Sequence, residues 1–213
     1  MGGAILSPHP SLKWILASAS PRRAEILRKA GFQFDIFPAH VDETRFPHEG
    51  AEDYVRRLAA AKSQLAADRF QSSIARNSEQ NPGPAIVIAA DTIVVVDGEI
   101  FGKPANAADA RRMLLALSDR THEVLTALSL VKIPAGLKAL HVESTRVSFV
   151  PLSEKEVDDY IATGEPFDKA GAYGIQGIGG RFVWRIEGCY FNVMGLPLSR
   201  LWTTIRSFSE QIE

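Results

Sequence analysis

The sequence has a single cysteine, Cys189, among its 213 residues. One cysteine cannot close an internal disulfide or build a zinc site of several thiolates, so a reducing compartment is favoured. Every apolar run ends before about 18 residues, the length that a membrane-spanning helix needs. The stretch 12–19 has the composition of a signal-peptide core. However, prolines precede it, and the basic segment that begins a signal peptide is missing there. We therefore expect a cytoplasmic protein without a membrane segment.

An excess of charge of one sign is also absent. Lysine and arginine together number 24 and aspartate and glutamate 25, which gives a net charge of -1 at pH 7. This balance supplies no general attraction to nucleic acid or to an anionic membrane surface. We expect neither of them as a partner.

Several familiar ligand-binding motifs are missing as well. The chain has no Walker A sequence and no Gly-x-Gly-x-x-Gly, so P-loop and Rossmann nucleotide sites have no support. His40, His48, His122 and His141 do not have the spacing of a zinc site. We interpret these histidines as structural or surface residues.

The chain does contain enough apolar sequence for a core, since 46% of its residues are hydrophobic. Strand and helix patterns follow one another in mixed order, which predicts an α/β protein with a long mixed sheet. We expect one domain over residues 1–213, with an N-terminal extension at 1–12. Residues 71–84 hold few large apolar side chains and are expected to form an exposed loop.

Local patterns place the individual elements. Strands are expected at 14–17, 32–37, 85–90, 122–133 and 137–150, and helices at 21–30, 51–70, 107–117, 153–163 and 197–208. Asp97-Gly98 predicts a hairpin turn, and Ser153 followed by Glu156 predicts a capping box. The segments 181–186 and 189–193 are interpreted as a further hairpin.

Asp91 stands between two apolar runs, 85–90 and 93–96. Burying a carboxylate is costly unless it is paired or bound to a metal. One interpretation is a capping or turn carboxylate at a strand end. The other is a catalytic or metal-binding carboxylate at the mouth of a sheet.

The segment Ser18–Arg23 joins a predicted strand to a helix that Ser20 would cap and Pro21 would begin. The free N–H groups and the dipole at a helix start favour an anion. Two serine hydroxyls, Arg22 and Arg23 add donors that suit phosphate. A plain serine cap with two solvated arginines is the alternative.

Other charged residues gain meaning only in combination. Lys62 and Lys103 would each pass for a surface lysine, but with the two arginines they would supply enough charge for a polyphosphate. Asp42 and Glu43 lie in a polar loop, where acidic residues are usually solvated. Together with Asp91 they offer the oxygen ligands that Mg²⁺ requires.

The segment Asp168–Gly177 is rich in glycine and also holds a lysine, a tyrosine and Gln176. Glycines let a backbone approach a ligand closely. The Gln176 amide can donate and accept hydrogen bonds, so it could recognise the edge of a base. A flexible loop without a ligand is the alternative.

These motifs, in this order, resemble the Maf family of nucleoside triphosphate pyrophosphatases. The matching segments are Leu16–Arg23, Ala90–Thr92, Gly102–Pro104, Asp168–Gly177 and Gly195–Pro197. The resemblance covers about residues 13–206. It implies a fold related to the inosine triphosphate pyrophosphatases, with an elongated mixed sheet flanked by helices and two lobes around a central cleft. Dimers are common in the family, which makes a homodimer a candidate assembly.

The form of the segment Asp168–Gly177 resembles the branch of the family that acts on dTTP and UTP. The resemblance implies hydrolysis to the monophosphate and pyrophosphate with a divalent metal, Mg²⁺ or Mn²⁺, as a house-cleaning activity. Asp91 would then be the catalytic position and, with Glu43, a metal ligand. The remaining implied positions are substrate-binding Ser18, Arg23, Lys62 and Lys103, and specificity-determining Arg22, Thr92 and Gln176.

Three questions stay open from the sequence. The general base could be Asp91 or Glu43. The substrate could instead be 7-methyl-GTP or another modified nucleotide. The protein could also be a nucleotide-binding regulator of cell division, since the family was first linked to septum formation.

Overall fold

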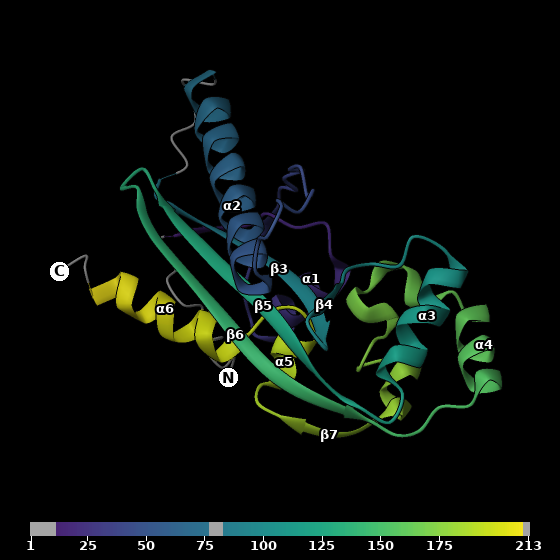
Figure 1. Ribbon diagram of the computed structural model, residues 1–213. Coiled ribbons are helices and arrows are strands. Elements are labelled where there is room, and N and C mark those ends of the chain that lie inside the picture. The colour runs from purple at the N-terminus through teal and green to yellow at the C-terminus, as the bar shows by residue number, and fades with distance from the viewer. Residues whose placement is uncertain (1–11, 77–82, 211–213) are drawn as a thin grey trace, which may run out of the picture. The chain divides into compact units, whose positions relative to one another are not determined.

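A computed structural model describes residues 12–76 and 83–210 of the chain (Figure 1). The strands are β1 (Lys13–Leu16), β2 (Asp35–Ile36), β3 (Ala85–Val96), β4 (Glu99–Phe101), β5 (Thr121–Ile133), β6 (Leu137–Phe149) and β7 (Val183–Glu187). The α-helices are α1 (Pro21–Lys29), α2 (Ala51–Arg76), α3 (Ala107–Leu117), α4 (Glu154–Ala162), α5 (Tyr190–Val193) and α6 (Leu198–Glu210). Short 3₁₀ turns lie at Glu165–Asp168, Ala170–Ala172 and Ile178–Phe182.

The strands form one seven-stranded sheet in the order β2-β1-β3-β5-β6-β7, with β4 paired to β3 beside this path. β1 is parallel to both β2 and β3, whereas β4 is antiparallel to β3 and β7 is antiparallel to β6. The prediction of a mixed α/β sheet flanked by helices is confirmed. The chain divides into two compact units, unit 1 with Met1–Asp91, Ala127–Val142 and Leu198–Glu213, and unit 2 with Thr92–Thr126 and Glu143–Pro197.

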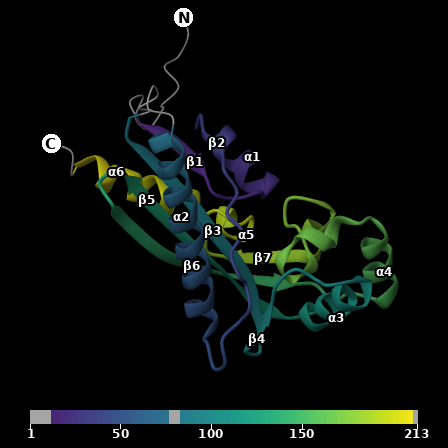
Figure 2. The same cartoon turned by 90° about the horizontal axis from the view of Figure 1, so that it is seen from above.

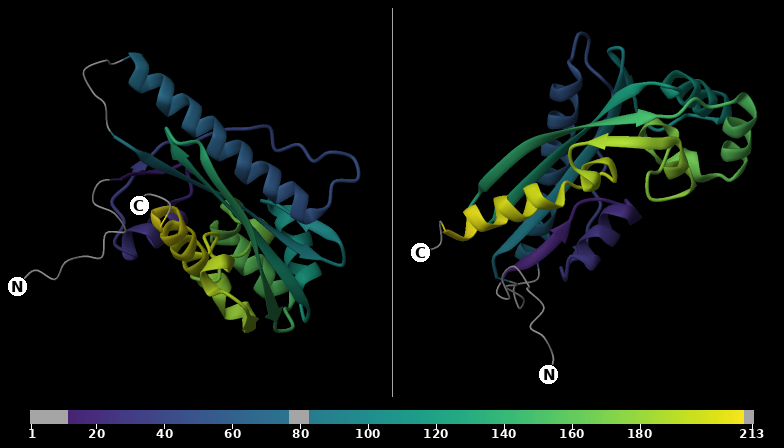
Figure 3. Two further views of the ribbon diagram at one scale, coloured as in Figure 1. Left: turned by 90° about the vertical axis from the view of Figure 1, so that its left-hand side faces the viewer. Right: turned by 90° about the horizontal axis from the view of Figure 1, so that it is seen from below.

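In unit 1 the core lies between the strands and the long helix α2. The side chains that α2 buries are mainly small, and the buried residues are Val55, Leu58, Ala59, Ser63, Ala66 and Ala67. They recur at helical spacing, so they form one face of α2. Figure 3 shows α2 on one face of these strands and α1 and α6 on the other. Because both faces are covered, β3 is apolar along almost its whole length instead of alternating.

Figure 2 shows how α1 lies beside β1 and β2, the two strands that it connects. β2 is shorter than the strand expected at 32–37. It pairs with β1 only at Ile15↔Asp35 and Leu16↔Ile36, and the Phe32 N–H is still bonded to the Leu27 carbonyl at the end of α1.

In unit 2 the helices α3 and α4 lie side by side (Figure 1). Their apolar faces meet an aromatic cluster in which Phe149 makes edge-on contacts with His122 and Tyr173, and Tyr160 with Phe182. The predicted capping box at the start of α4 is confirmed, with Ser153 and Glu156 each bonded to the other's backbone. The turn at Asp97-Gly98 also joins β3 to β4 as predicted, with both residues at positive φ.

Two expectations about local structure were wrong. Residues 71–76, expected in a loop, continue α2, and within this extension Ser72 and Ser73 donate their hydroxyl protons to carbonyls of the preceding turn. Residues 77–82 of that predicted loop lie outside the described residues, as does most of the N-terminal extension. The expected strand at 189–193 is the short helix α5, since Gly188 at φ 132° ends the extended backbone.

None of the helices in residues 12–76 and 83–210 combines the length and the hydrophobicity that crossing a bilayer requires.

Burial of His122 predicts a pH dependence of stability. Its ring is enclosed by Phe149 and Tyr173, and its Nε2 lies 2.9 Å from the Tyr173 hydroxyl. Burial lowers the pKa of His122 from 6.5 to about 4. The unfolded chain therefore binds a proton on this imidazole between pH 6.5 and pH 4, while the folded protein does not. The fold is destabilised as the pH falls through that window, by roughly 3 kcal/mol in total.

We expect urea unfolding from pH 7 to pH 4 to show most of this loss in the wild type and a smaller loss in His122→Gln. Glutamine can still bond to the Tyr173 hydroxyl but does not titrate. Equal slopes of unfolding free energy against pH in the two proteins would contradict the assignment.

Candidate active site

The start of α1 presents a group of hydrogen-bond donors. β1 ends at Leu16, the N–H of Ala17 donates to the Ile88 carbonyl at 2.8 Å, and the chain then turns into the helix at Pro21. Ser20 occupies the N-cap position but makes no side-chain cap bond, so the predicted serine cap is confirmed only in position. The oxygen that accepts is instead Ser18 Oγ, which receives bonds from the Ser20 N–H at 3.2 Å and from Arg23 Nη1 at 3.1 Å.

Asp91 lies inside β3 and not at its end, which corrects the expectation of a carboxylate at a strand terminus. The neighbouring strand explains its position. Pairing between β1 and β3 stops at Leu16↔Ile88, three residues before Asp91. Asp91 therefore lies where β3 extends beyond the end of its parallel partner β1. The carboxyl ends of parallel strands are a common place for a ligand site.

Lys62 on α2 balances the charge of Asp91. Its Nζ lies 2.5 Å from Asp91 Oδ1 and 2.6 Å from Glu43 Oε1. The side chains of Lys62 and Asp91 are each 12% exposed, whereas that of Glu43 is 58% exposed. One ammonium thus faces two carboxylates, which leaves one negative charge in excess.

Arg23 belongs to the same electrostatic environment. Burial lowers the pKa of its guanidinium, and the charges of Asp91 and Glu43 oppose that shift. The effect of both carboxylates on Arg23 places the start of α1 within reach of the Lys62 group. In unit 1 the structure therefore brings together Ser18, Arg23, Glu43, Lys62 and Asp91. Arg22, half-buried, is the second residue of α1.

Within residues 12–76 and 83–210, no group of three or more His, Cys, Asp and Glu side chains could hold a metal. Asp42, considered with Glu43 as a ligand, is exposed and accepts a bond from the Thr44 N–H at 2.8 Å. Asp91 and Glu43 nevertheless converge on one cation, the Lys62 ammonium. Two carboxylates suit Mg²⁺ bound together with substrate phosphates, which is a common mode for this ion.

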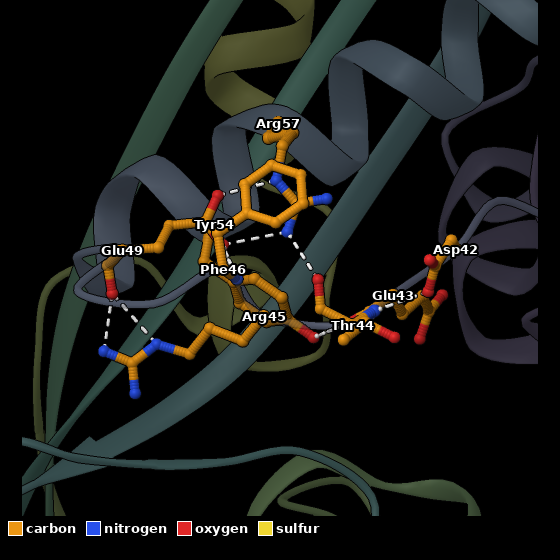
Figure 4. Close-up of polar contacts among 8 residues, drawn as sticks. All are labelled: Asp42, Glu43, Thr44, Arg45, Phe46, Glu49, Tyr54 and Arg57. Atoms are coloured by element: carbon orange, nitrogen blue, oxygen red, sulfur yellow. Dashed lines mark hydrogen bonds and ion pairs between the residues drawn. The ribbon is translucent and has the colours of Figure 1, made fainter.

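The loop that carries Glu43 is fastened to the first turns of α2 (Figure 4). Arg57 donates to both carboxylate oxygens of Glu49, at 2.6 and 2.8 Å, and to the Thr44 carbonyl at 3.0 Å. Its guanidinium also covers the Phe46 ring, with 4.0 Å to the centroid. The hydrogen bond from Arg57 is the main cause that lowers the pKa of Glu49 to about 2. The ion pair therefore persists far into acid.

Tyr54 forms a second attachment of the same loop. Its hydroxyl donates to the backbone carbonyl of Glu43 at 2.8 Å. Burial raises the pKa of this hydroxyl, and the negative charges of Asp91 and Glu43 raise it further, so it remains a donor. Figure 4 shows Tyr54 and Arg57 both reaching from α2 to the loop. The backbone at Glu43 is thus held at the residue whose carboxylate meets Lys62.

In unit 2, Thr92 is the first residue of a buried polar chain. Its Oγ1 lies 3.0 Å from Thr126 Oγ1, and Thr126 donates to the Asn192 carbonyl at 3.0 Å. The Asn192 amide donates to the Val124 carbonyl and to Thr145 Oγ1. The short helix α5 therefore anchors the hydroxyls beside Thr92.

Lys103 and Gln176 are exposed side chains of unit 2. The carbonyl of Gly102, next to Lys103, accepts a bond from the Gly171 N–H at 3.0 Å. The turn that carries Lys103 is thus bonded to the segment Asp168–Gly177. Thr92, Lys103 and Gln176 belong to unit 2, and the roles of all these site residues remain predictions.

Sequence reasoning missed the supporting residues. Tyr54, Glu49, Arg57 and Thr126 carry no sequence motif, and only the fold brings them to the predicted residues. Asn192 did give a signal, because it is an amide within an apolar run and so resembles Asp91 as a buried polar group that needs partners.

Comparison with known proteins identifies the family. The model of the family described as Maf-like protein matches residues 13–208. The chain belongs to the Maf family. A dTTP/UTP pyrophosphatase of Methylococcus capsulatus is 50% identical over 187 residues, which are 88% of this chain and 86% of the relative. The dTTP/UTP pyrophosphatase of Koribacter versatilis is 46% identical over 90% of this chain and 92% of the relative. The dTTP/UTP pyrophosphatase of Pasteurella multocida is 44% identical over 94% of this chain and 98% of the relative.

The attachment of the Glu43 loop to α2 can be tested with neighbouring arginines. Arg57→Ala removes the partner of Glu49, so we expect hydrogen exchange at residues 43–49 to accelerate about tenfold, as loss of a charge-assisted bond predicts. Arg56 is the matched control, because its exposed pair with Glu52 at 2.6 Å lies on α2 alone. Similar exchange in Arg57→Ala and Arg56→Ala would rule out this attachment.

Proposed function

We propose that the protein hydrolyses dTTP and UTP to the monophosphate and pyrophosphate. Relatives that are 43–50% identical over most of the chain are named dTTP/UTP pyrophosphatases, which supports this substrate choice. The observation that carries the proposal is the Lys62 ammonium between Asp91 and Glu43. This ammonium and its two carboxylates lie in the same unit as the start of α1, whose hydrogen-bond donors suit a phosphate group.

The cationic side chains would bind the triphosphate. Arg23 offers a planar guanidinium fixed by Ser18, and Lys62 offers an ammonium fixed by two carboxylates. Fixed donors stabilise the charge that develops on a leaving pyrophosphate without having to reorganise. Lys103, which is exposed, would add a further positive charge, as the family pattern implies.

Mg²⁺ or Mn²⁺ would be held by the carboxylates of Asp91 and Glu43, together with phosphate oxygens of the substrate. When bound, such a cation lowers the pKa of a coordinated water and neutralises phosphate charge. Of the two carboxylates, we assign the catalytic role to Asp91. Its burial and its contact with Lys62 fix its direction, whereas Glu43 is mostly exposed.

Base selection would fall to Gln176 and Thr92, with Arg22. The Gln176 amide offers one donor and one acceptor that match the alternating groups on the edge of uracil or thymine. A polar pocket strongly rejects a base that leaves the polar groups of the pocket without hydrogen-bond partners. An apolar pocket discriminates much less strongly against a base of the wrong shape. A cytoplasmic location, supported by the single cysteine, and a homodimer remain part of the proposal.

The activity is tested with a panel of canonical and modified nucleoside triphosphates in the presence of Mg²⁺ or Mn²⁺. Pyrophosphate and orthophosphate are detected separately. We expect pyrophosphate from dTTP and UTP, and a loss of kcat in Asp91→Asn on the order of 10²–10³. The orthophosphate product of a different bond cleavage would contradict the proposal.

Other outcomes of the same panel point to the alternatives. Preference for 7-methyl-GTP or another modified nucleotide would replace the substrate and keep the site. Tight nucleotide binding with no product, in wild type and Asp91→Asn alike, would favour the regulator of cell division.

The proposed metal ligands predict a shift in metal requirement. Glu43→Gln removes a charged oxygen ligand, so we expect the metal concentration for half-maximal activity to rise about tenfold. Asp42→Asn is the matched control, because this exposed neighbour bonds to Thr44 and asparagine can accept the same bond. An unchanged requirement in Glu43→Gln, or an equal shift in Asp42→Asn, would exclude Glu43 as a ligand.

A further inference from the structure

Gln176 sits at the tip of a tight turn. The Gly177 N–H donates to the Gly174 carbonyl at 3.1 Å, which closes a turn with Ile175 and Gln176 at its two central positions. The Gln176 side chain is exposed, and among residues 12–76 and 83–210 it has no hydrogen-bond partner. The direction of its amide therefore depends on how firmly the turn is held.

One carboxylate holds the far side of this turn. Glu165 Oε2 accepts a bond from the Ile178 N–H at 2.9 Å, and Oε1 accepts one from the Gly179 N–H at 3.1 Å. These amides belong to the second and third residues after Gln176. Charge-assisted bonds to backbone N–H groups are stronger than neutral ones, so the carboxylate holds this side of the turn more firmly than a neutral acceptor would.

The near side of the turn is attached to the same carboxylate through Tyr160. The Tyr160 hydroxyl donates to Glu165 Oε1 at 2.9 Å and accepts a bond from the Gly174 N–H at 3.2 Å. Lys169 in turn fixes Glu165, because its Nζ donates to the Glu165 carbonyl at 2.6 Å. Burial, the largest cause, raises the pKa of Tyr160, which keeps the phenol a neutral donor.

The glycines of the turn are required by these contacts. A Cβ at Gly177 would lie 2.5 Å from Glu165 Oε1, and a Cβ at Gly174 would lie 2.6 Å from Lys169 Cε. A Cβ at Gly179 would meet the Tyr160 hydroxyl at 2.6 Å. The backbone of the turn thus packs directly against the three side chains that hold it. Gly177 has a negative φ, which alanine could also adopt.

We propose that Glu165 is a positioning residue for substrate selection: through Ile178, Gly179 and Tyr160 it fixes the turn that aims Gln176 at the base. The inference rests on the proposed function, in which Gln176 meets the base. Burial raises the pKa of Glu165, but the hydrogen bonds from Ile178 and Gly179 outweigh it and the net pKa is lowered. The carboxylate therefore stays charged at neutral pH.

The experiment compares Glu165→Ala with Glu156→Ala in the intact protein. Glu156 is a matched control, since its carboxylate also bonds to a hydroxyl and a backbone N–H, but both belong to Ser153 in the capping box of α4. kcat and KM are measured for dTTP, UTP, dCTP and dGTP. Hydrogen exchange of residues 174–180 is measured in the free protein.

For Glu165→Ala we expect faster exchange at Ile178 and Gly179 and a roughly tenfold fall in the kcat/KM preference for dTTP over dCTP. The loss should fall mainly on KM, because the base is remote from the reacting phosphate. Glu165→Gln keeps one acceptor oxygen and should be intermediate. Glu156→Ala should lower the thermal stability, because it removes one half of the capping box, and should leave the preference unchanged.

Gly177→Ala is a second route to the same effect and guards against misfolding of Glu165→Ala. Its methyl group would push the turn from the Glu165 carboxylate, so preference should fall in this variant. The double variant with Glu165→Ala should lose no more preference than Glu165→Ala alone, because both changes break the same contact. A wild-type preference in both single variants would overturn the inference, as would unchanged exchange at Ile178 and Gly179.

The proposed function fails separately, if the wild type releases no pyrophosphate from dTTP or UTP. In that case nucleotide preference is measured as a ratio of dissociation constants, and the same variants still test the role of Glu165.

Discussion

The buried ion pair between Asp91 and Lys62 is the constraint on which the arrangement of unit 1 depends. A carboxylate inside an apolar strand is costly to bury unless a cation meets it, and the cation has to come from an element packed on that strand. α2 supplies it from a face made mainly of alanine and other small residues, which lets the helix lie close to β3. Glu43 meets the same ammonium, and the Arg57 attachment holds the loop that carries Glu43.

Most of the fold could be predicted from the sequence, because its elements are long and their patterns are strong. The helix at 107–117, the strands after residue 121 and the capping box of α4 rest on periodicity and on local bonds, and both are readable in the chain. The failures are of another kind. The start of β2 is limited by the end of α1, where the Phe32 N–H bonds to the Leu27 carbonyl, and α2 continues through Ser72, whose hydroxyl bonds within the helix.

The site could be predicted only in part for the same reason. Asp91 gave a signal because a charge interrupts an apolar run, and the resemblance to the Maf family supplied the other positions. Glu49, Arg57 and Glu165 gave no such signal. Each holds a backbone segment through hydrogen bonds to partners that cannot be predicted from the sequence. The folded backbone, and not a sequence motif, determines which groups these bonds join.

The hydroxyl chain beside Thr92 has a fixed polarity. Thr126 has one hydroxyl proton, and the Asn192 carbonyl, which can only accept, takes it. In the contact between the two threonines the proton must then come from Thr92. Thr92 can then bond to any further group only as an acceptor, through the lone pairs of its oxygen. The buried backbone carbonyl of Asn192, two hydrogen bonds away, therefore decides whether Thr92 can donate or accept.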